Sequence, residues 1–188
     1  MDRAMNETTA GATAITRLDD VDTPCLVLDV DRMDRNVARL RGRLDGLGVS
    51  LRPHLKTAKS VEVARRVMVT PEGPATVSTL KEAEQFAAAG VRDMTYAVGI
   101  APSKLARVVD LRARGVDLVV VLDSLEQATA VAEASRRSGL RIPAMIEIDC
   151  DGHRSGVQPD AHAPLLAIAE ALAAGGELRG VLTHAGDS

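Results

Sequence analysis

Segments typical of strands and of helices alternate along this chain from about residue 49 to residue 183, and this alternation constrains the fold more than any other feature. Short apolar runs rich in valine, isoleucine and leucine predict strands. Longer stretches with apolar residues at helical spacing predict helices, and a glycine follows most of them. Strands that alternate with helices in this way favour βαβ units, and therefore a parallel sheet with right-handed connections.

The pattern predicts strands at residues 25–30, 49–56, 75–78, 94–98, 118–122, 144–148 and 178–183. Helices are expected at residues 33–47, 61–68, 80–89, 105–112, 125–138 and 165–172. Two of these helices begin with a capping-box pattern, Thr79 with Glu82 and Ser124 with Gln127.

Without the first strand, the chain contains about six strand–helix units, whereas a closed (β/α)8 barrel has eight and usually takes about 250 residues. No GxGxxG follows the first strand and no P-loop occurs, which argues against a dinucleotide-binding or nucleotide-binding fold. The predicted class is therefore α/β, an incomplete (β/α)8 TIM-type barrel. Residues 1–20 are polar and lack periodicity, so we expect a flexible arm there and a partial barrel over residues 21–188.

Composition excludes several classes of partner and location. The formal net charge of -3 and the near absence of aromatic residues argue against nucleic-acid binding. No apolar run reaches the length of a membrane span, and the first 20 residues lack the apolar centre of a signal peptide, so we expect a cytoplasmic protein with no membrane partner. Cys25 and Cys150 lie in apolar runs typical of strands, and we expect both to be buried free thiols.

The run from Arg52 to Lys56 alternates basic and apolar residues. On a strand, Arg52, His54 and Lys56 would share one face. If that face lines a cavity, neighbouring positive charges favour the neutral, nucleophilic form of a lysine, as Schiff-base chemistry requires. A solvated edge strand with its polar face outward explains the same pattern.

Other polar residues are expected at the same carboxyl edge of the sheet, where functional groups of parallel β/α folds collect. They are Ser78, Thr79, Tyr96, Gly99, Asp123, Ser124, residues 149–156 and residues 183–186. Together with Lys56, the candidates Arg154 and His184 suit a planar, anionic cofactor. Alternatively, Arg154 is a surface residue and His184 a structural histidine. Asp149, Asp151 and His153 lack the spacing of known metal motifs and are more typical of a turn.

Six motifs occur in order: DTPCLVLD at 22–29, RPHLKTAK at 52–59, STLKEAEQFAAAG at 78–90, YAVGIAP at 96–102, DGHRSGV at 151–157 and LTHAG at 182–186. Through them the chain resembles the fold-type III pyridoxal-phosphate enzymes, the alanine racemase-like barrel group, and most closely the D-threonine aldolase and D-serine dehydratase-like family. D-Serine dehydratases usually read KTHK where this chain reads KTAK, so Ala58 favours the aldolase branch.

The resemblance implies roles for individual residues. It makes Lys56 the catalytic, Schiff-base lysine, His184 the residue stacked on the cofactor ring, and Arg154 a group near the phenolic oxygen. His54 would line the same pocket, and Arg52 would lie deeper in the barrel interior. In this family, loops after later strands bind the phosphate and a carboxyl-terminal β domain supplies divalent-metal ligands, so no metal ligand is expected in this chain.

The implied activity is that of the amino-terminal part of a pyridoxal 5'-phosphate-dependent lyase that cleaves D-threonine-type β-hydroxy-D-amino acids to glycine and an aldehyde. The implied partners are a small amino-acid substrate and, at full length, a second copy in a homodimer. D-Serine dehydratase-like or racemase activity, a non-catalytic cofactor-carrying barrel, and an inactive fragment stay open as alternatives. The expectation is a truncated or split chain.

Overall fold

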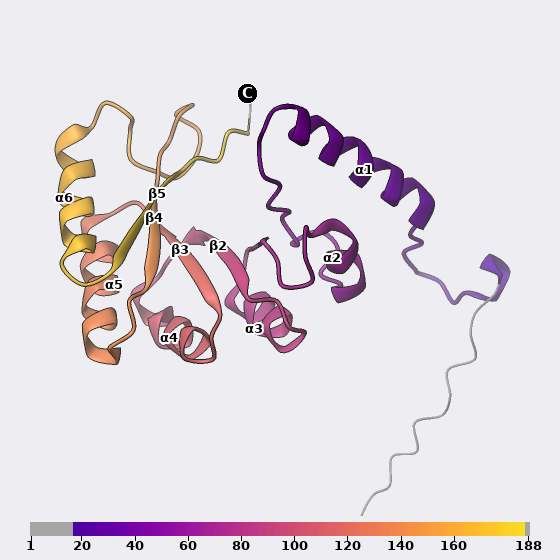
Figure 1. The fold of residues 1–188 in the computed structure, drawn as a ribbon, viewed down its shortest axis with the longest axis horizontal. Coiled ribbons are helices and arrows are strands. Elements are labelled where there is room, and N and C mark those ends of the chain that lie inside the picture. Colours follow the sequence, from indigo (N-terminus) through magenta and orange to yellow (C-terminus); the bar gives the residue numbers. More distant parts are fainter. Residues whose placement is uncertain (1–16, 187–188) are drawn as a thin grey trace, which may run out of the picture.

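The computed structural model describes residues 17–186, and at its centre lies a five-stranded parallel sheet (Figure 1). The strand order is the sequence order, as in a barrel wound in one direction. The strands are β1 (Ala75–Val77), β2 (Asp93–Gly99), β3 (Asp117–Leu122), β4 (Pro143–Glu147) and β5 (Glu177–Leu182). These strands and the helices between them form an incomplete TIM-like barrel, which confirms the predicted fold class.

Helices connect the strands and cover one face of the sheet (Figure 1). The connecting helices are α3 (Leu80–Ala88), α4 (Leu105–Ala113), α5 (Leu125–Ser138) and α6 (His162–Ala173). Two further helices, α1 (Val30–Gly46) and α2 (Val61–Val67), precede β1, and α1 lies apart from the sheet. The core lies between these helices and the strand residues Met94, Leu118 and Ala144, all of which are fully buried. Core residues at every second position of β1 to β4 explain why the sequence pattern located these strands.

The two predicted capping boxes differ in outcome. At α3, Thr79 accepts a hydrogen bond from the Glu82 N–H and the Glu82 carboxylate accepts one from the Thr79 N–H, so this box is confirmed. At α5, Ser124 accepts from the Gln127 N–H, but the Gln127 side chain accepts from the Asp123 N–H rather than that of Ser124. The second box is therefore only half formed.

The predicted strand at residues 25–30 is wrong. The segment is irregular up to Asp29, and α1 begins at Val30. Leu26 is fully exposed, and no strand in the described part of the chain pairs with this segment. The expected burial of both cysteines is also wrong, because Cys25 lies in this exposed segment and Cys150 lies in the turn after β4.

The predicted strand at residues 49–56 is reduced to a single bridge between His54 and Thr76 of β1. Two backbone hydrogen bonds hold it, from Leu55 N–H to Thr76 C=O at 2.9 Å and from Thr76 N–H to Pro53 C=O at 2.8 Å. Proline has no N–H to donate and the chain turns directly after His54, so the ladder does not extend. The segment still occupies the place of a further strand beside β1.

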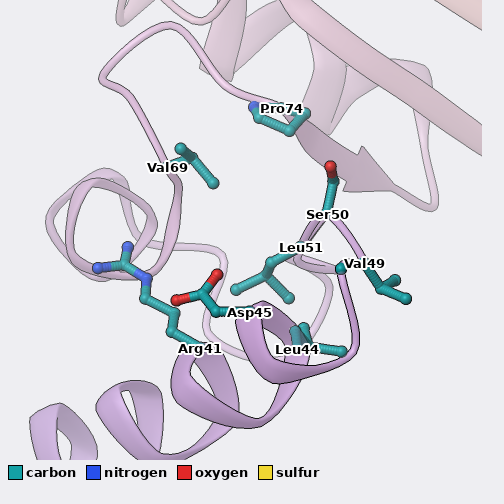
Figure 2. Close-up of a pocket in the computed structure, with 9 residues that line it drawn as sticks. Arg41, Leu44, Asp45, Val49, Ser50, Leu51, Val69 and Pro74 are labelled. Carbon is teal, nitrogen blue, oxygen red and sulfur yellow. The ribbon is translucent and has the colours of Figure 1, made fainter.

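The amino-terminal region packs loosely on the rest. Of the predicted arm, residues 1–16 lie outside the described residues, and residues 17–20 are exposed. α1 has no buried residue and is attached through Arg41, which donates to the carbonyl groups at the end of α2, and through an Arg66–Asp34 ion pair. A cleft of about 570 Å³ separates α1 from the segments around Ser50 and Pro74 (Figure 2). Within residues 17–186, no helix is long and apolar enough to span a membrane.

Candidate functional site

His54 lies half-buried at the carboxyl end of the sheet, where the bridge to Thr76 fixes its backbone. Its Nδ1 accepts a hydrogen bond from the Lys56 N–H at 3.3 Å, and its Nε2 lies 3.3 Å from the Ser78 hydroxyl. Because Nδ1 accepts, the neutral ring carries its proton on Nε2 and donates to Ser78. His54 is thereby oriented from both sides of its ring.

The pKa of His54 is shifted by burial and by the charges of three other side chains. Burial lowers the pKa of His54 below its usual value, and the positive charge of Lys56 lowers it further. Glu82 acts in the opposite direction, and His184 makes a smaller contribution that also lowers the pKa. Two of the predicted site residues, Lys56 and His184, therefore lie within electrostatic reach of His54.

The two lysines of the KTAK motif differ in their partners. Lys59 Nζ lies 3.3 Å from the buried Glu82 carboxylate. Burial acts to raise the pKa of Glu82, but hydrogen bonds from Ser78, Lys59 and Thr79 outweigh it and leave the pKa lowered. Lys56 is exposed, and its Nζ has no hydrogen-bond or ion-pair partner among residues 17–186. Lys59 is thus held by a carboxylate, whereas Lys56 is available to a ligand.

His184 follows β5 and meets the last residue of β4. Its Nδ1 lies 2.6 Å from Glu147 Oε1, and only 4% of Glu147 is exposed. Glu147 was not among the residues expected at the site. The alternation of β4 could have pointed to it, since a charged residue in an otherwise apolar, buried strand requires a partner.

Arg154 is carried by a loop that two carboxylates organise. Asp149 accepts hydrogen bonds from the N–H groups of Gly152 and Arg154, and Asp123 accepts one from the N–H of Gly156. A Cβ on Gly156 would lie 2.5 Å from Asp149 N, and its φ of +131° also requires glycine.

Asp149 therefore shapes the turn, as predicted. Burial acts to raise the pKa of Asp149, but hydrogen bonds from Gln158 and the loop N–H groups outweigh it and leave the pKa lowered. No group of three or more histidine, cysteine, aspartate or glutamate side chains within residues 17–186 could hold a metal ion.

The Arg154 side chain is exposed and extends from this loop toward the turn after β5. A Cβ on Gly186 would lie 4.0 Å from Arg154 Nη1, so the guanidinium lies beside the segment that carries His184. The guanidinium has no ion-pair or hydrogen-bond partner in the described part of the chain. Arg154 and Lys56 are thus two uncompensated cations at one end of the sheet.

Two residues that the sequence analysis singled out lie away from this edge. Tyr96 is buried on the helix-covered face of β2, where its hydroxyl lies 3.1 Å from Lys104 Nζ. Arg52 is exposed at the amino end of the sheet and paired with Asp93, rather than in the barrel interior where the resemblance placed it. Arg52, His54 and Lys56 were predicted to lie on one face of a strand. They do not, because the chain turns after His54.

The side chains that remain at the carboxyl end suit a planar, anionic aldehyde. An unpaired lysine can form a carbonyl adduct, an unpaired guanidinium can bind an oxyanion, and an imidazole fixed through Nδ1 can lie against a ring. The described residues contain these three groups on the turns after the His54 bridge, β4 and β5. The donor set therefore fits pyridoxal phosphate.

Comparison with known proteins identifies related chains. The family description "Alanine racemase, N-terminal domain" matches residues 28–188. D-threo-3-hydroxyaspartate dehydratase of Delftia sp. (strain HT23) is 53% identical over 169 residues, which are 89% of this chain and 44% of that protein. Its solved structure superposes with a TM-score of 0.86, at 52% identity and with the same coverage.

Aldolases are also similar. D-Threonine aldolase of Arthrobacter sp. is 33% identical over 142 residues, 75% of this chain and 37% of that protein. The structure of D-threonine aldolase from Filomicrobium marinum superposes with a TM-score of 0.76 at 31% identity, covering 87% of this chain and 44% of that one. The chain thus spans less than half the length of the relatives it matches.

Proposed function

Since the chain belongs to the alanine racemase N-terminal domain family, we propose that it is the cofactor-binding part of a pyridoxal-phosphate-dependent lyase of β-hydroxy-D-amino acids. The observation that carries the proposal is Lys56, unpaired among residues 17–186, beside an oriented His54 in a chain 53% identical to a dehydratase of such an amino acid. A lysine without a carboxylate partner is available to attack an aldehyde. Lys59, paired with Glu82, is not.

Each residue of the proposed site has a distinct task. Lys56 binds the cofactor covalently, Arg154 binds its phenolic oxygen, and His184 lies against its ring. His54, kept neutral by burial and by the charge of Lys56, lines the pocket without adding a further positive charge. When bound, pyridoxal phosphate serves as an electron sink for negative charge that develops on the substrate Cα.

The reaction we propose first is dehydration of a 3-hydroxy-D-aspartate-type substrate. The higher identity of the dehydratase, 53% against 33% for the Arthrobacter aldolase, supports it. Loss of water from such an amino acid, followed by hydrolysis, leaves ammonia and a 2-oxo acid. The proposed substrate is therefore a small, polar amino acid.

Retro-aldol cleavage of D-threonine is the second candidate. Ala58 and the similarity to D-threonine aldolases support it. Cleavage would leave glycine and an aldehyde, with no ammonia released. A divalent metal bound by another part of the protein, a homodimer and a cytoplasmic location remain predictions from the resemblance and the sequence.

The test uses the full chain together with any continuation that its gene encodes. Borohydride reduction in the presence of pyridoxal phosphate, followed by peptide mass spectrometry, should find the adduct on Lys56. Incubation with D-threo-3-hydroxyaspartate and with D-threonine, assayed for ammonia and for glycine, separates dehydration from cleavage. An adduct without either product would favour a non-catalytic carrier, and no adduct would contradict the proposal.

A further inference from the structure

The ends of β4 and β5 are joined by three interactions within a few residues. The Ile148 N–H donates to the Leu182 carbonyl at 2.8 Å, and the Thr183 hydroxyl donates to Cys150 Sγ at 3.0 Å. The third is the contact of 2.6 Å between Glu147 Oε1 and His184 Nδ1. The first two hold the backbone and the turns, whereas the third holds the imidazole itself.

Glu147 is a charged side chain in a place that disfavours charge. It is 4% exposed and follows the buried Ile146. Burying an unpaired carboxylate is costly, and a charge-assisted hydrogen bond offsets that cost. His184 is the one side chain within residues 17–186 that pairs with this carboxylate. A carboxylate only accepts hydrogen bonds, so the proton in this contact lies on His184 Nδ1.

We propose that Glu147 is a positioning residue that keeps a proton on Nδ1 of His184 and sets the plane of its ring for contact with the cofactor. The proposal rests on the proposed function in its second part, the contact with pyridoxal phosphate. A carboxylate on one ring nitrogen fixes both the tautomer and the orientation of an imidazole. The other nitrogen, Nε2, is left for the site.

A purely structural role for Glu147 would predict only a loss of stability when it is replaced. The positioning role also predicts a change in the proton on the ring and in cofactor binding. Glu147→Gln keeps the shape and removes the charge. Cys150→Ala is the matched control, because it removes the neighbouring contact between the same two turns and leaves Glu147 and His184 in place.

The experiment is nitrogen-15 spectroscopy of the full chain, selectively labelled at its four histidines, with His184→Gln to assign the signal. We expect wild-type His184 to carry a proton on Nδ1, alone or together with Nε2. In Glu147→Gln the Nδ1 signal should move toward that of an unprotonated nitrogen, and the dissociation constant for pyridoxal phosphate should rise about tenfold. Cys150→Ala should change neither.

A wild-type ring protonated on Nε2 alone would overturn the proposal without any variant. So would a Glu147→Gln protein whose cofactor affinity equals that of the wild type, whatever its nitrogen signals. Failure of the proposed function looks different. If pyridoxal phosphate does not attach to Lys56 in the wild type, the function is wrong, while the nitrogen signals still report whether Glu147 sets the tautomer of His184.

Discussion

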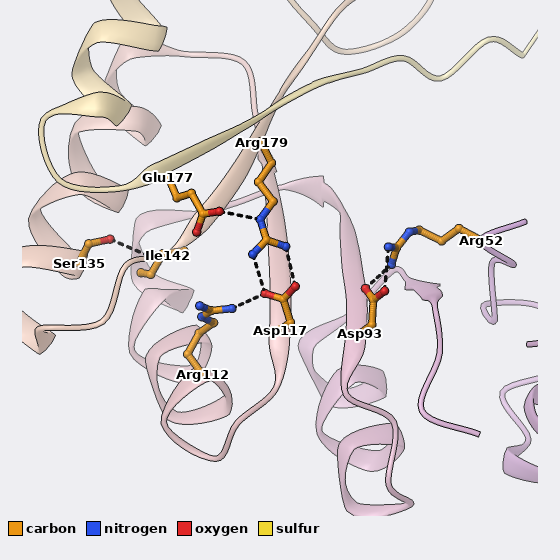
Figure 3. A network of polar contacts seen from close by, with 8 residues as sticks. All are labelled: Arg52, Asp93, Arg112, Asp117, Ser135, Ile142, Glu177 and Arg179. Carbon is orange, nitrogen blue, oxygen red and sulfur yellow. Dashed lines mark hydrogen bonds and ion pairs between the residues drawn. The ribbon is translucent and has the colours of Figure 1, made fainter. Parts of the chain in front are cut away.

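The two ends of the parallel sheet both collect charged side chains, but they pair them differently. At the amino end, Asp93, the first residue of β2, binds Arg52, and Asp117, the first residue of β3, binds both Arg112 and Arg179 (Figure 3). Arg179 also binds Glu177. At the carboxyl end, the described residues leave the Lys56 and Arg154 cations without a carboxylate.

The difference in pairing indicates a difference in role. At Asp117, burial acts to raise the pKa, but hydrogen bonds from Arg179 and Arg112 outweigh it and leave the pKa lowered. Charges neutralised within the chain contribute to stability and leave little for a ligand. In β/α barrels, the amino end typically serves stability and the carboxyl end serves catalysis. Substitutions at the two ends should therefore separate stability from function.

The largest effect is expected from Lys56→Ala. Loss of the proposed cofactor lysine should lower lyase activity of the complete protein by about a thousandfold or more, because the covalent attachment is lost. Stability should change little, since Lys56 is exposed and unpaired within the described chain. Steady-state assays and urea unfolding measure the two effects. Lys59→Ala is the control, and equal losses of activity in both variants would contradict the assignment.

Gly156→Ala should destabilise the carboxyl end itself. A Cβ would lie 2.5 Å from Asp149 N at a φ of +131°, which costs about 1 to 3 kcal/mol of unfolding free energy. Urea unfolding measures the loss. Gly152→Ala, where a Cβ meets nothing within 4 Å, should cost less despite its own positive φ. Equal losses would show that the contact with Asp149 is unimportant.

Asp117→Asn should test the amino end. Two arginines lose a charged partner, so the free energy of unfolding should fall by about 1 to 2 kcal/mol, with allowance for the partial exposure of the pair. Urea unfolding at low and high salt measures it, and the loss should shrink as salt rises. Glu133→Gln, from the exposed pair with Arg137, should change stability by less than about 0.5 kcal/mol. Activity of Asp117→Asn should stay near that of the wild type.

The smallest effect is the pH dependence that His54 contributes. Its pKa is lowered on folding, so between the usual value near 6.5 and the lowered one the unfolded chain binds more protons. Stability should therefore fall as the pH decreases through this window, by less than about 1 kcal/mol after allowance for solvent screening. Urea unfolding at several pH values measures the slope. His54→Gln should flatten it, and an unchanged slope would contradict the assignment to His54.

Much of the fold could be predicted because its signals are local. The alternation of strands and helices, the capping box of Thr79 and Glu82, and the turn at Asp149 each depend on residues within a few positions of one another. The wrong predictions concern segments whose structure depends on partners far away in the sequence. Residues 25–30 have the composition of a strand but no strand to pair with in the described chain.

In the candidate site, too, some features could be predicted from the sequence and others could not. By itself, the sequence determined the barrel class and the motifs that carry Lys56, Arg154 and His184, because periodicity and motif order are properties of the linear chain. Only the tertiary structure decided that Glu82 pairs with Lys59 rather than Lys56, and that Glu147 meets His184. Such pairs depend on the register of strands far apart in the chain, and ion pairing is decided by distances of a few ångströms that no spacing in a sequence specifies.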